Sequence, residues 1–335
     1  MGKTLIIAEA GVNHNGKLDL AFKLCEEAKK AGADVVKFQT FKTENNITRN
    51  VEMAEYQKKN VGKRKSQFDM VKELELSYED FKKVKTFCEK IGIEFLSTPP
   101  DEESLDFLVS LGLQAIKIGS GEINNIPYLR KVGQKKTNVI LSTGMATLEE
   151  VKRAYNTIRQ NGAKSTALLH CTTNYPCAIN EVNLRAMVTL KEAFGTKVGY
   201  SDHTLGKDVA VAAVALGAEI IEKHFTLDKN MEGPDHAASA DPKEFAGYVR
   251  ALRDVETILG TSTKKPTKSE KQYIPLVRKS LVARRVIKKG EKFTKENLAI
   301  KRPGTGLHPR LYFKLLGKKA KRDLAADEML SKRDL

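Results

Sequence analysis

The sequence predicts an α/β protein: a (β/α)8 TIM barrel followed by a small C-terminal domain. Short apolar runs rich in β-branched residues alternate with amphipathic stretches over residues 1–260. Eight such pairs in this length fit a closed parallel barrel better than an open sheet. Near residue 260 the sequence turns polar, as linkers do. We therefore expect a catalytic barrel over residues 1–260, a linker over 261–278 and a small domain over 279–335.

The expected barrel strands are the eight apolar runs. They cover residues 5–8, 35–38, 93–96, 115–118, 139–141, 167–169, 197–199 and 218–221. Amphipathic stretches between the runs, such as 18–30, 78–91, 148–159 and 207–216, are expected helices. A long insertion at residues 42–76, after the second strand, is long enough to lie over the mouth of the barrel.

Composition excludes several classes of protein. No apolar stretch approaches the ~18–20 residues that span a bilayer, and the N-terminus has no signal-peptide architecture. The four cysteines form no CxxC pair and are too sparse for a disulfide framework. We expect a soluble, cytoplasmic protein without a membrane partner.

The C-terminal part is strongly basic. Residues 279–335 have the pattern of short strands and turns, with strand-like runs at 280–283 and 298–301. Residues 264–335 hold 22 Lys and Arg against 7 acids, whereas residues 1–263 hold 36 against 35. One hypothesis is therefore a polyanion-binding module. Because the region lacks interleaved aromatic residues and a nucleic-acid motif, a solvated basic face without a specific nucleic-acid partner is the simpler interpretation.

Polar or ionisable residues lie at the C-terminal end of every one of the eight apolar runs. They are Glu9; Lys37 and Gln39; Ser97 and Thr98; Lys117, Ser120 and Glu122; Ser142 and Thr143; His170 and Thr173; Ser201, Asp202 and His203; and Glu222, Lys223 and His224. The C-terminal ends of parallel barrel strands converge on one face, where such enzymes hold their chemistry. A single Ser or Thr at a strand end could be an N-cap, but eight polar ends favour a site.

Two lysines lie within apolar runs and suggest an anion site. Lys37 and Lys117 would each place an ammonium group inside or above the barrel, where an unpaired charge is costly. Extension of each side chain outward to solvent is the alternative. Nearby hydroxyls would complete the site; they belong to Thr98, Ser120, Ser142 and Ser201.

Two histidines end neighbouring strands and suggest a metal site. His203 and His224 could share one divalent ion and leave positions open for water and substrate. His170 has the pattern of a structural histidine, whereas His14 and His236 lie in loops that could also face the mouth. Three acids are candidates for acid/base work or for binding a sugar hydroxyl, and sequence alone does not rank them: Glu9, Glu122 and Asp235.

These residues lie in motifs that resemble one family. The motifs are IAEAGVNHNG at 7–16, VKFQT at 36–40, LSTP at 96–99, KIGSGE at 117–122, LSTGM at 141–145, YSDHT at 200–204, EKHFT at 222–226 and GPDH at 233–236. They resemble the bacterial sialic acid synthases, which are phosphoenolpyruvate-dependent N-acetylneuraminate synthases and their legionaminic acid relatives. KRPGTG at 301–306 is similar to the active-site loop of the family's antifreeze-like C-terminal (SAF, β-clip) domain.

The resemblance implies a reaction and a set of roles. Phosphoenolpyruvate would condense with an N-acylated hexosamine and water to give a nine-carbon α-keto acid and phosphate. Phosphoenolpyruvate would be held by Lys37, Thr98, Lys117, Ser120, Ser142 and Ser201. His203 and His224 would bind a divalent metal, Mn²⁺ above Mg²⁺ or Co²⁺, which would polarise the aldehyde oxygen. Glu9 would be the main acid/base residue, with Lys37 and Gln39 beside it.

The resemblance also implies a sugar site and a dimer. The sugar would contact Gln39, Glu122, Tyr175, Asp235 and Arg302. Arg302 would come from the partner subunit, in a homodimer whose C-terminal domains are swapped onto the partner barrels. Two departures from the family pattern leave roles open: Pro100 stands where many relatives have Phe, and Thr173 where some have Asn.

Two questions stay open at the level of sequence. The sugar could be N-acetylmannosamine or 2,4-diacetamido-2,4,6-trideoxymannose, with a lean toward the legionaminic branch from residues 74–76 and 222–229. Another metal-dependent phosphoenolpyruvate-using barrel enzyme, such as a deoxy-heptulosonate-type synthase, or an aldolase, is the alternative function.

Overall fold

The structure is a computed structural model that describes residues 2–53, 57, 60 and 66–334. The chain divides into two compact units, residues 1–260 and 261–335. Among the described residues, no helix is long and apolar enough to cross a membrane.

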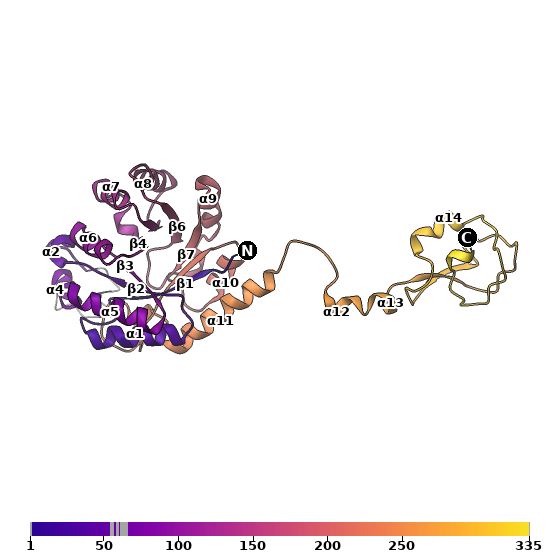
Figure 1. The fold of residues 1–335 in the computed structure, drawn as a ribbon, viewed down its shortest axis with the longest axis horizontal. Helices are drawn as coiled ribbons and strands as arrows, with labels where there is room; N and C mark the ends of the chain where they lie inside the picture. Colours follow the sequence, from indigo (N-terminus) through magenta and orange to yellow (C-terminus); the bar gives the residue numbers. More distant parts are fainter. Residues whose placement is uncertain (1, 54–56, 58–59, 61–65, 335) are drawn as a thin grey trace. The chain divides into compact units, whose positions relative to one another are not determined.

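The first unit is the expected parallel barrel (Figure 1). Its strands are β1 (Leu5–Gly11), β2 (Val35–Gln39), β3 (Glu94–Thr98), β4 (Ala115–Ile118), β5 (Asn138–Ser142), β6 (Ser165–Cys171), β7 (Val198–Asp202) and β8 (Ile220–His224). The hydrogen-bonded order is β3-β2-β1-β8-β7-β6-β5-β4, and every pair is parallel. The two end strands, β3 and β4, also contact each other, so the barrel is nearly closed.

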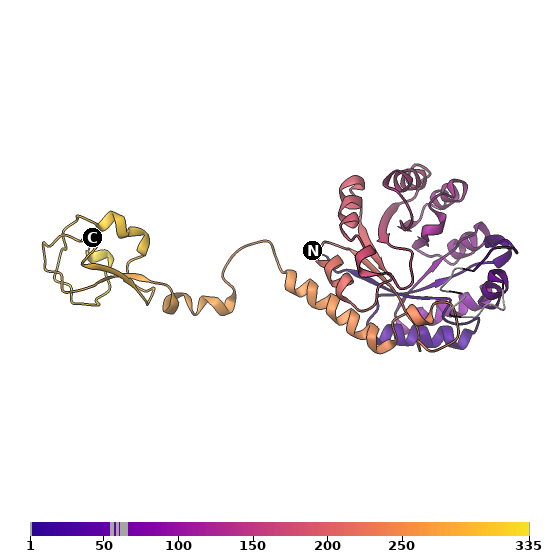
Figure 2. The ribbon, with the colours of Figure 1, turned by 180° about the vertical axis from the view of Figure 1, so that it is seen from behind.

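Helices surround this barrel, as both ribbon views show (Figure 2). They are α1 (Leu18–Lys30), α2 (Thr43–Asn46), α4 (Gln67–Glu73), α5 (Tyr78–Ile91), α6 (Glu102–Ser110), α7 (Ile126–Gln134), α8 (Leu148–Gln160), α9 (Arg185–Phe194), α10 (Asp208–Ala215) and α11 (Pro242–Leu259). Side-chain caps explain where several begin: the Thr147 hydroxyl accepts from the Glu150 amide at α8, and the Asp241 carboxylate accepts from the Glu244 amide at α11. Single-turn helices lie at η1 (Ser120–Glu122), η2 (Ile179–Glu181) and η3 (His236–Ala238).

Two apolar layers hold the barrel together. The larger one fills the space between strands and helices, with members such as Phe38, Phe81 and Phe225. The smaller one fills the barrel interior and consists of Ile7, Val35, Leu96, Ile140, Ala167, Leu169 and Ile220, with Leu5 and Ala115 packed against it. Because the interior is filled by side chains, the barrel offers no pore, and any site must lie above this layer.

Most strands continue further than the apolar runs predicted. β1 extends to Gly11, β5 to Ser142 and β8 to His224, so polar residues expected just after the apolar runs lie within the strands. They remain in extended backbone, where successive side chains point to opposite faces.

The insertion at 42–76 contains α2 and α4. Residues 54–56, 58–59 and 61–65 of it lie outside the described residues.

The second unit is a small antiparallel domain. Its sheet pairs β9 (Ser280–Ala283) with β10 (Leu298–Lys301), at the two ranges that the sequence predicted. Isolated bridges add Met329, Leu324 and Lys319 to this framework, and ten buried residues form its core. The expected linker contains two short helices, α12 (Lys268–Lys271) and α13 (Ile274–Val277). Further short helices are η4 (Pro309–Leu311), α14 (Tyr312–Leu315) and η5 (Lys332–Asp334).

Candidate active site

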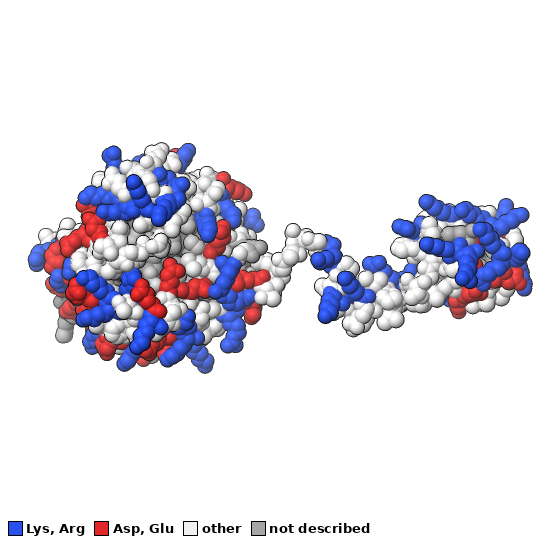
Figure 3. Space-filling view, in the orientation of Figure 1, with Lys and Arg blue, Asp and Glu red and all other residues white. Residues whose placement is uncertain are grey.

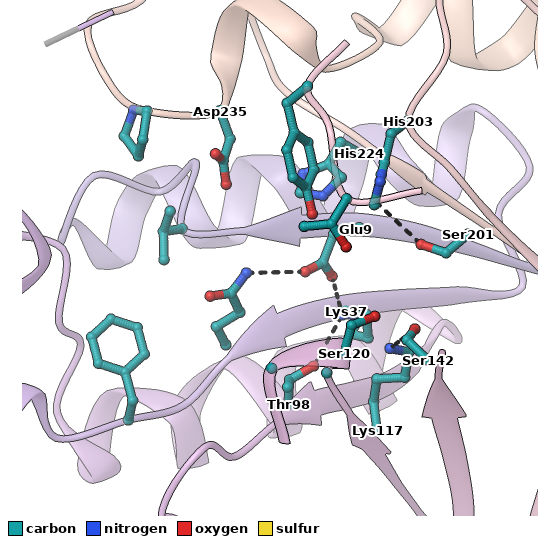
Figure 4. Close-up of a pocket in the computed structure, with 18 of the residues that line it drawn as sticks. Glu9, Lys37, Thr98, Lys117, Ser120, Ser142, Ser201, His203, His224 and Asp235 are labelled. Atoms are coloured by element: carbon teal, nitrogen blue, oxygen red, sulfur yellow. Dashed lines mark hydrogen bonds and ion pairs between the residues drawn. The ribbon is translucent and has the colours of Figure 1, made fainter. Parts of the chain in front are cut away.

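A pocket of about 340 Å³ opens at the C-terminal ends of the barrel strands. Its size falls in the range of small-molecule sites. Ten of its residues are labelled in Figure 4: Glu9, Lys37, Thr98, Lys117, Ser120, Ser142, Ser201, His203, His224 and Asp235. The insertion contributes the apolar side of the wall, with Ile47, Met70, Val71 and Leu74.

The alternation of side chains along the strands builds the pocket floor. Ile7, Val35, Leu96, Ile140, Leu169 and Ile220 fill the barrel interior. The residue two positions further along each strand lines the pocket: Glu9, Lys37, Thr98, Ser142, Cys171 and Glu222. Lys117 follows Ala115 in the same way. Residues two positions apart on a strand face the same side. These polar groups therefore form a layer directly above the apolar one.

Two lysines and two carboxylates form a buried ionic cluster in this layer. Lys37 Nζ lies 2.8 Å from Glu9 Oε2 and 3.6 Å from Glu222 Oε2, and it donates to Thr98 Oγ1 at 3.0 Å. Lys117 Nζ donates to Ser142 Oγ at 2.6 Å and lies 3.8 Å from Glu222 Oε1. Both lysine side chains are only 3% exposed, so neither extends outward to solvent.

The surroundings in this cluster shift the pKa values of its two carboxyl groups in opposite directions. Burial raises the pKa of Glu9 to about 7, against the attraction of Lys37 and with the repulsion of Glu222. Burial also disfavours ionised Glu222, but Lys117 and Lys37 outweigh it and lower the pKa of Glu222 to about 2. Near neutral pH, Glu222 is therefore ionised, while Glu9 is poised to gain or lose a proton.

Small polar groups surround the space beside Lys117. Ser120 Oγ accepts from the Gly144 amide at 2.9 Å and lies 3.2 Å from Cys171 Sγ. A Cβ on residue 144 would approach Ser120 Oγ and Cys171 Sγ to 2.9 Å and would collide with Thr173 Oγ1. Only glycine fits at this position, and the Thr173 hydroxyl belongs to the same small cradle.

The two histidines lie together in the pocket. Their ring centroids are 5.5 Å apart. His203 Nδ1 donates to the Thr172 carbonyl at 2.7 Å, because a carbonyl oxygen only accepts. With Nδ1 protonated, His203 Nε2 carries the ring's lone pair, and the Ser201 hydroxyl lies 3.4 Å from it. His224 Nδ1 is buried and has no hydrogen-bond partner among the described residues. Burial lowers the pKa of both rings, which keeps them neutral.

This donor set fits a divalent metal with two protein ligands. Neutral imidazoles are the form that binds metal, and a second bond that orients a ring is typical of metal-ligating histidines. In the described part of the chain, no group of three or more His, Cys, Asp or Glu residues could hold an ion. The remaining coordination positions would therefore fall to water and substrate.

Three of the five expected sugar contacts line the pocket: Gln39, Tyr175 and Asp235. Gln39 Nε2 donates to Glu9 Oε1 at 3.4 Å, and the Tyr175 ring centroid lies 4.2 Å from that of His203. Burial raises the pKa of Asp235 to about 6. Glu122 is not among the residues that line the pocket, and its carboxylate accepts from Asn125 Nδ2 at 2.8 Å. Arg302 lies in the second unit, just after β10.

Two sequence-based expectations about histidines are wrong. His14 and His236 are fully buried and do not line the pocket. The His14 ring packs against Phe38 and Phe81, which belong to the outer apolar layer. His236 joins the Thr226 hydroxyl at 2.6 Å and Asn15 Oδ1 at 3.1 Å, so it holds loops together.

His170 has the structural role that its pattern favoured. Its Nε2 donates to the Val182 carbonyl at 2.7 Å, outside the pocket. Pro100 lies in a separate hollow, with Asp101, Asn125 and Tyr128.

Sequence reasoning missed two residues of the pocket floor. Glu222 was recognised only as a polar strand end, and Cys171 was given no role. The signal that would have found both is the period of two, since each lies two positions after an apolar residue of the barrel interior.

The fold and the pocket define the class of protein: a β/α-barrel enzyme with its ionisable residues gathered at the C-terminal ends of the strands. The model of the NeuB family matches residues 24–264, and that of the SAF domain matches residues 278–335. The chain belongs to the NeuB family. The resemblance to sialic acid synthases is thereby confirmed.

Individual relatives cover nearly the whole chain. It is 52% identical over 332 residues to the N,N'-diacetyllegionaminic acid synthase of Campylobacter jejuni, covering 98% of this chain and 99% of that protein. Identity to the N,N'-diacetyllegionaminic acid synthase of Legionella pneumophila is 49%, covering 97% of this chain and 92% of that protein. The solved N-acetylneuraminic acid synthetase of Leptospira borgpetersenii has a TM-score of 0.71 at 36% identity, covering 82% of this chain and 90% of that one.

Proposed function

We propose that the protein condenses phosphoenolpyruvate with an N-acylated hexosamine and water, giving a nine-carbon sialic-type α-keto acid and phosphate. The observation that carries the proposal is the pair of buried lysines, Lys37 and Lys117, above the apolar floor of a barrel mouth. Membership of the NeuB family supports it. A fixed cationic site suits a substrate that remains anionic throughout the reaction.

Phosphoenolpyruvate would occupy the cationic side of the pocket. Its phosphate and carboxylate would take hydrogen bonds from the two lysines and from nearby hydroxyls, those of Thr98, Ser120, Ser142 and Ser201. The cradle around Gly144 adds the Thr173 hydroxyl, so we include Thr173 among the ligands, while the Gly144 amide holds the Ser120 hydroxyl in place.

Glu9 would be the residue that donates and accepts protons during the reaction. A pKa of about 7 gives both protonation states near neutral pH, which suits a group that donates in one step and accepts in another. Lys37 and Gln39 hold its carboxylate from two sides, at 2.8 and 3.4 Å. The new carbon–carbon bond forms between the enol carbon and the aldehyde carbon. The aldehyde oxygen takes up a proton, and water adds at the carbon that carries the phosphate and gives up a proton. The bond from that carbon to the phosphate oxygen then breaks.

The metal would be bound by His203 and His224. We propose Mn²⁺, with Mg²⁺ or Co²⁺ as substitutes; a bound divalent ion supplies Lewis-acid polarisation of the aldehyde oxygen.

The sugar would lie on the side of Gln39, Tyr175 and Asp235, where the pocket wall is partly apolar. We favour 2,4-diacetamido-2,4,6-trideoxymannose over N-acetylmannosamine, because two relatives at about half identity are N,N'-diacetyllegionaminic acid synthases. The methyl groups of a diacetamido deoxy sugar would suit the apolar residues of the insertion, such as Ile47 and Leu74.

The working form would be a homodimer in which Arg302 reaches the sugar of the partner barrel. We also propose a cytoplasmic location, since all four cysteines are free, as is usual in a reducing compartment.

A direct assay tests the reaction. Purified protein with Mn²⁺, phosphoenolpyruvate and each candidate sugar should release phosphate and form a product whose mass is that of the sugar plus pyruvic acid. In ¹⁸O-labelled water the phosphate should stay unlabelled, because the carbon–oxygen bond is the one that breaks. Lys117→Met should abolish turnover, whereas Lys191→Met, at a surface ion pair, should leave it unchanged.

Three outcomes would contradict the proposal. They are phosphate release without sugar, no release with either sugar, and a lysine adduct trapped by borohydride, which would point to the aldolase alternative.

A further inference from the structure

A buried ion pair lies on the outer face of β7 and β8, behind the two histidines. Asp202 and Lys223 face each other in the β7–β8 ladder, with Lys223 Nζ 3.2 Å from Asp202 Oδ2. The side chains are 0% and 4% exposed. Their chain neighbours Ser201, Glu222 and His224 point into the pocket, so the ion pair points away from it.

The Asp202 carboxylate is fully engaged. Its Oδ1 accepts from the Thr204 amide at 2.9 Å and from the Thr204 hydroxyl at 2.7 Å. Its Oδ2 accepts from Lys223 and from the Tyr248 hydroxyl at 2.9 Å. Lys223 also donates to the Thr204 carbonyl and lies 5.6 Å from the centroid of the Tyr248 ring. Tyr248 comes from α11, so three separate elements meet at this group.

These bonds hold the backbone on both sides of His203. Asp202 precedes His203 and Thr204 follows it, and the bonds between them close a tight turn around that residue. Lys223 then ties both sides of the turn to β8, one residue before His224. The relative position of the two imidazoles therefore depends on this network.

A buried ion pair is a weak source of stability, because removing two charges from water offsets much of their attraction. The role of this ion pair is therefore to fix the positions of nearby residues. Metal affinity depends on donor positions within about 0.2 Å, and partners that orient the ligands are commonly worth 10–100-fold in affinity.

We propose that Asp202, Lys223 and Tyr248 form a clamp of positioning residues that sets the separation of His203 and His224, and through it the affinity for the divalent metal. The inference rests on the metal site of the proposed function. None of the three residues would touch metal or substrate.

Two variants of different severity test the clamp. Tyr248→Phe keeps the ring and removes one bond to Asp202, whereas Asp202→Asn keeps the shape and removes the charge. The matched control is Tyr200→Phe, also a buried tyrosine, on β7, whose hydroxyl has no hydrogen-bond partner in the described part of the chain. Metal-free protein would be titrated with Mn²⁺, with free Mn²⁺ followed by electron paramagnetic resonance. Binding of phosphoenolpyruvate would be measured separately without metal, along with thermal unfolding.

The clamp predicts a selective loss. Mn²⁺ affinity should fall several-fold in Tyr248→Phe and about 10–100-fold in Asp202→Asn. Phosphoenolpyruvate affinity should stay within about twofold, and Tyr200→Phe should match the wild type. If Asp202→Asn does not fold, Tyr248→Phe decides alone.

Other results would overturn the inference in distinguishable ways. If Tyr248→Phe binds Mn²⁺ with wild-type affinity, the clamp proposal is wrong, whereas the proposed metal site is unaffected. Equal losses of Mn²⁺ and phosphoenolpyruvate affinity would indicate a merely structural network. A wild-type protein that binds no Mn²⁺ would overturn the proposed metal site and the clamp together.

Discussion

At the scale of single residues, the unusual feature is Glu222, a buried carboxylate inside a pocket proposed for an anion. It lies between Lys37 and Lys117, at 3.6 and 3.8 Å, and accepts from the Ser201 hydroxyl at 3.1 Å. Without it, two buried ammonium groups would repel each other before substrate arrives. Glu222 therefore stabilises the empty site, and its charge opposes the bound anion.

Glu222→Gln tests this balance. The change leaves Lys117 without its carboxylate partner and Lys37 with Glu9 alone, which should lower the melting temperature by on the order of 10 °C, as expected for one broken buried pair. Phosphoenolpyruvate should then stabilise the variant by more degrees than it stabilises the wild type, because the site has become more positive. Thermal unfolding with and without phosphoenolpyruvate measures both effects. Glu219→Gln, at a surface ion pair, is the control and should change little. An equal or smaller ligand shift in Glu222→Gln would contradict this account.

Asp235 should give the reaction an acid limb. Burial raises its pKa to about 6. Above that pH the carboxylate is ionised and can accept a hydrogen bond from a hydroxyl of the sugar. As pH falls through about 6, protonation removes the acceptor, and kcat/KM for the sugar should fall up to tenfold per pH unit. Profiles of kcat/KM for wild type and Asp235→Asn should therefore differ below about pH 6, where the variant should keep only the pH dependence that comes from Glu9, whose pKa is about 7. Identical profiles would exclude Asp235 as the titrating group.

Some site residues could be predicted from sequence and others could not. Lys37 and Lys117 stand out because a charge inside an apolar run must be held by something. Glu222 does not stand out, because neighbouring residues at that strand end are also ionisable, and only the inward or outward direction separates Glu222 from Lys223. His14 and His236 were misplaced because a loop histidine near glycine has the same pattern whether it faces a pocket or packs under it.

At the scale of elements, the predicted strands differ from the observed ones mainly in length. Apolar runs mark only the part of each strand that contacts the core, whereas the hydrogen-bonded ladder continues into polar residues. Hydropathy therefore found all eight strands and ended most of them early. The loops after the strands depend on contacts that no local pattern contains, such as the cradle made by β4, β5 and β6.

Gly144→Ala tests that cradle. The added methyl would meet Ser120, Cys171 and Thr173, which should displace the hydroxyls and weaken phosphoenolpyruvate binding by about tenfold or more. Gly247→Ala is the control, since a Cβ there meets nothing within 4 Å and alanine favours its helix. Calorimetric titration with phosphoenolpyruvate measures the difference. Unchanged affinity in Gly144→Ala would place the phosphate elsewhere in the pocket.

At the scale of the whole molecule, charge is distributed unevenly between the units. Figure 3 shows Lys and Arg gathered over the face of the second unit that it displays. Most of the few acids there pair internally: Arg285 with Glu291, Lys288 with Asp323, Lys301 with Asp327, and Arg322 with Glu328 and Asp334. Many basic side chains therefore remain for solvent or for a partner. The sequence located this unit by its change in composition, and composition alone says nothing of what the unit contacts.

Complementation in a mixed dimer tests the proposed partner. With the proposed roles, Glu9→Gln should inactivate its barrel, and Arg302→Ala should weaken the binding of the sugar by the C-terminal domain. If the domains are swapped, a dimer of one chain of each kind joins an intact barrel to an intact Arg302, and one of its two sites works. Random mixing makes half the dimers mixed, so co-expressed chains should regain about a quarter of wild-type activity. Each variant alone should stay far below that level. If each domain served its own barrel, mixing would restore nothing, because every intact barrel would face an altered residue 302. Activity in the mixture equal to the average of the two separate variants would therefore rule out the swapped arrangement.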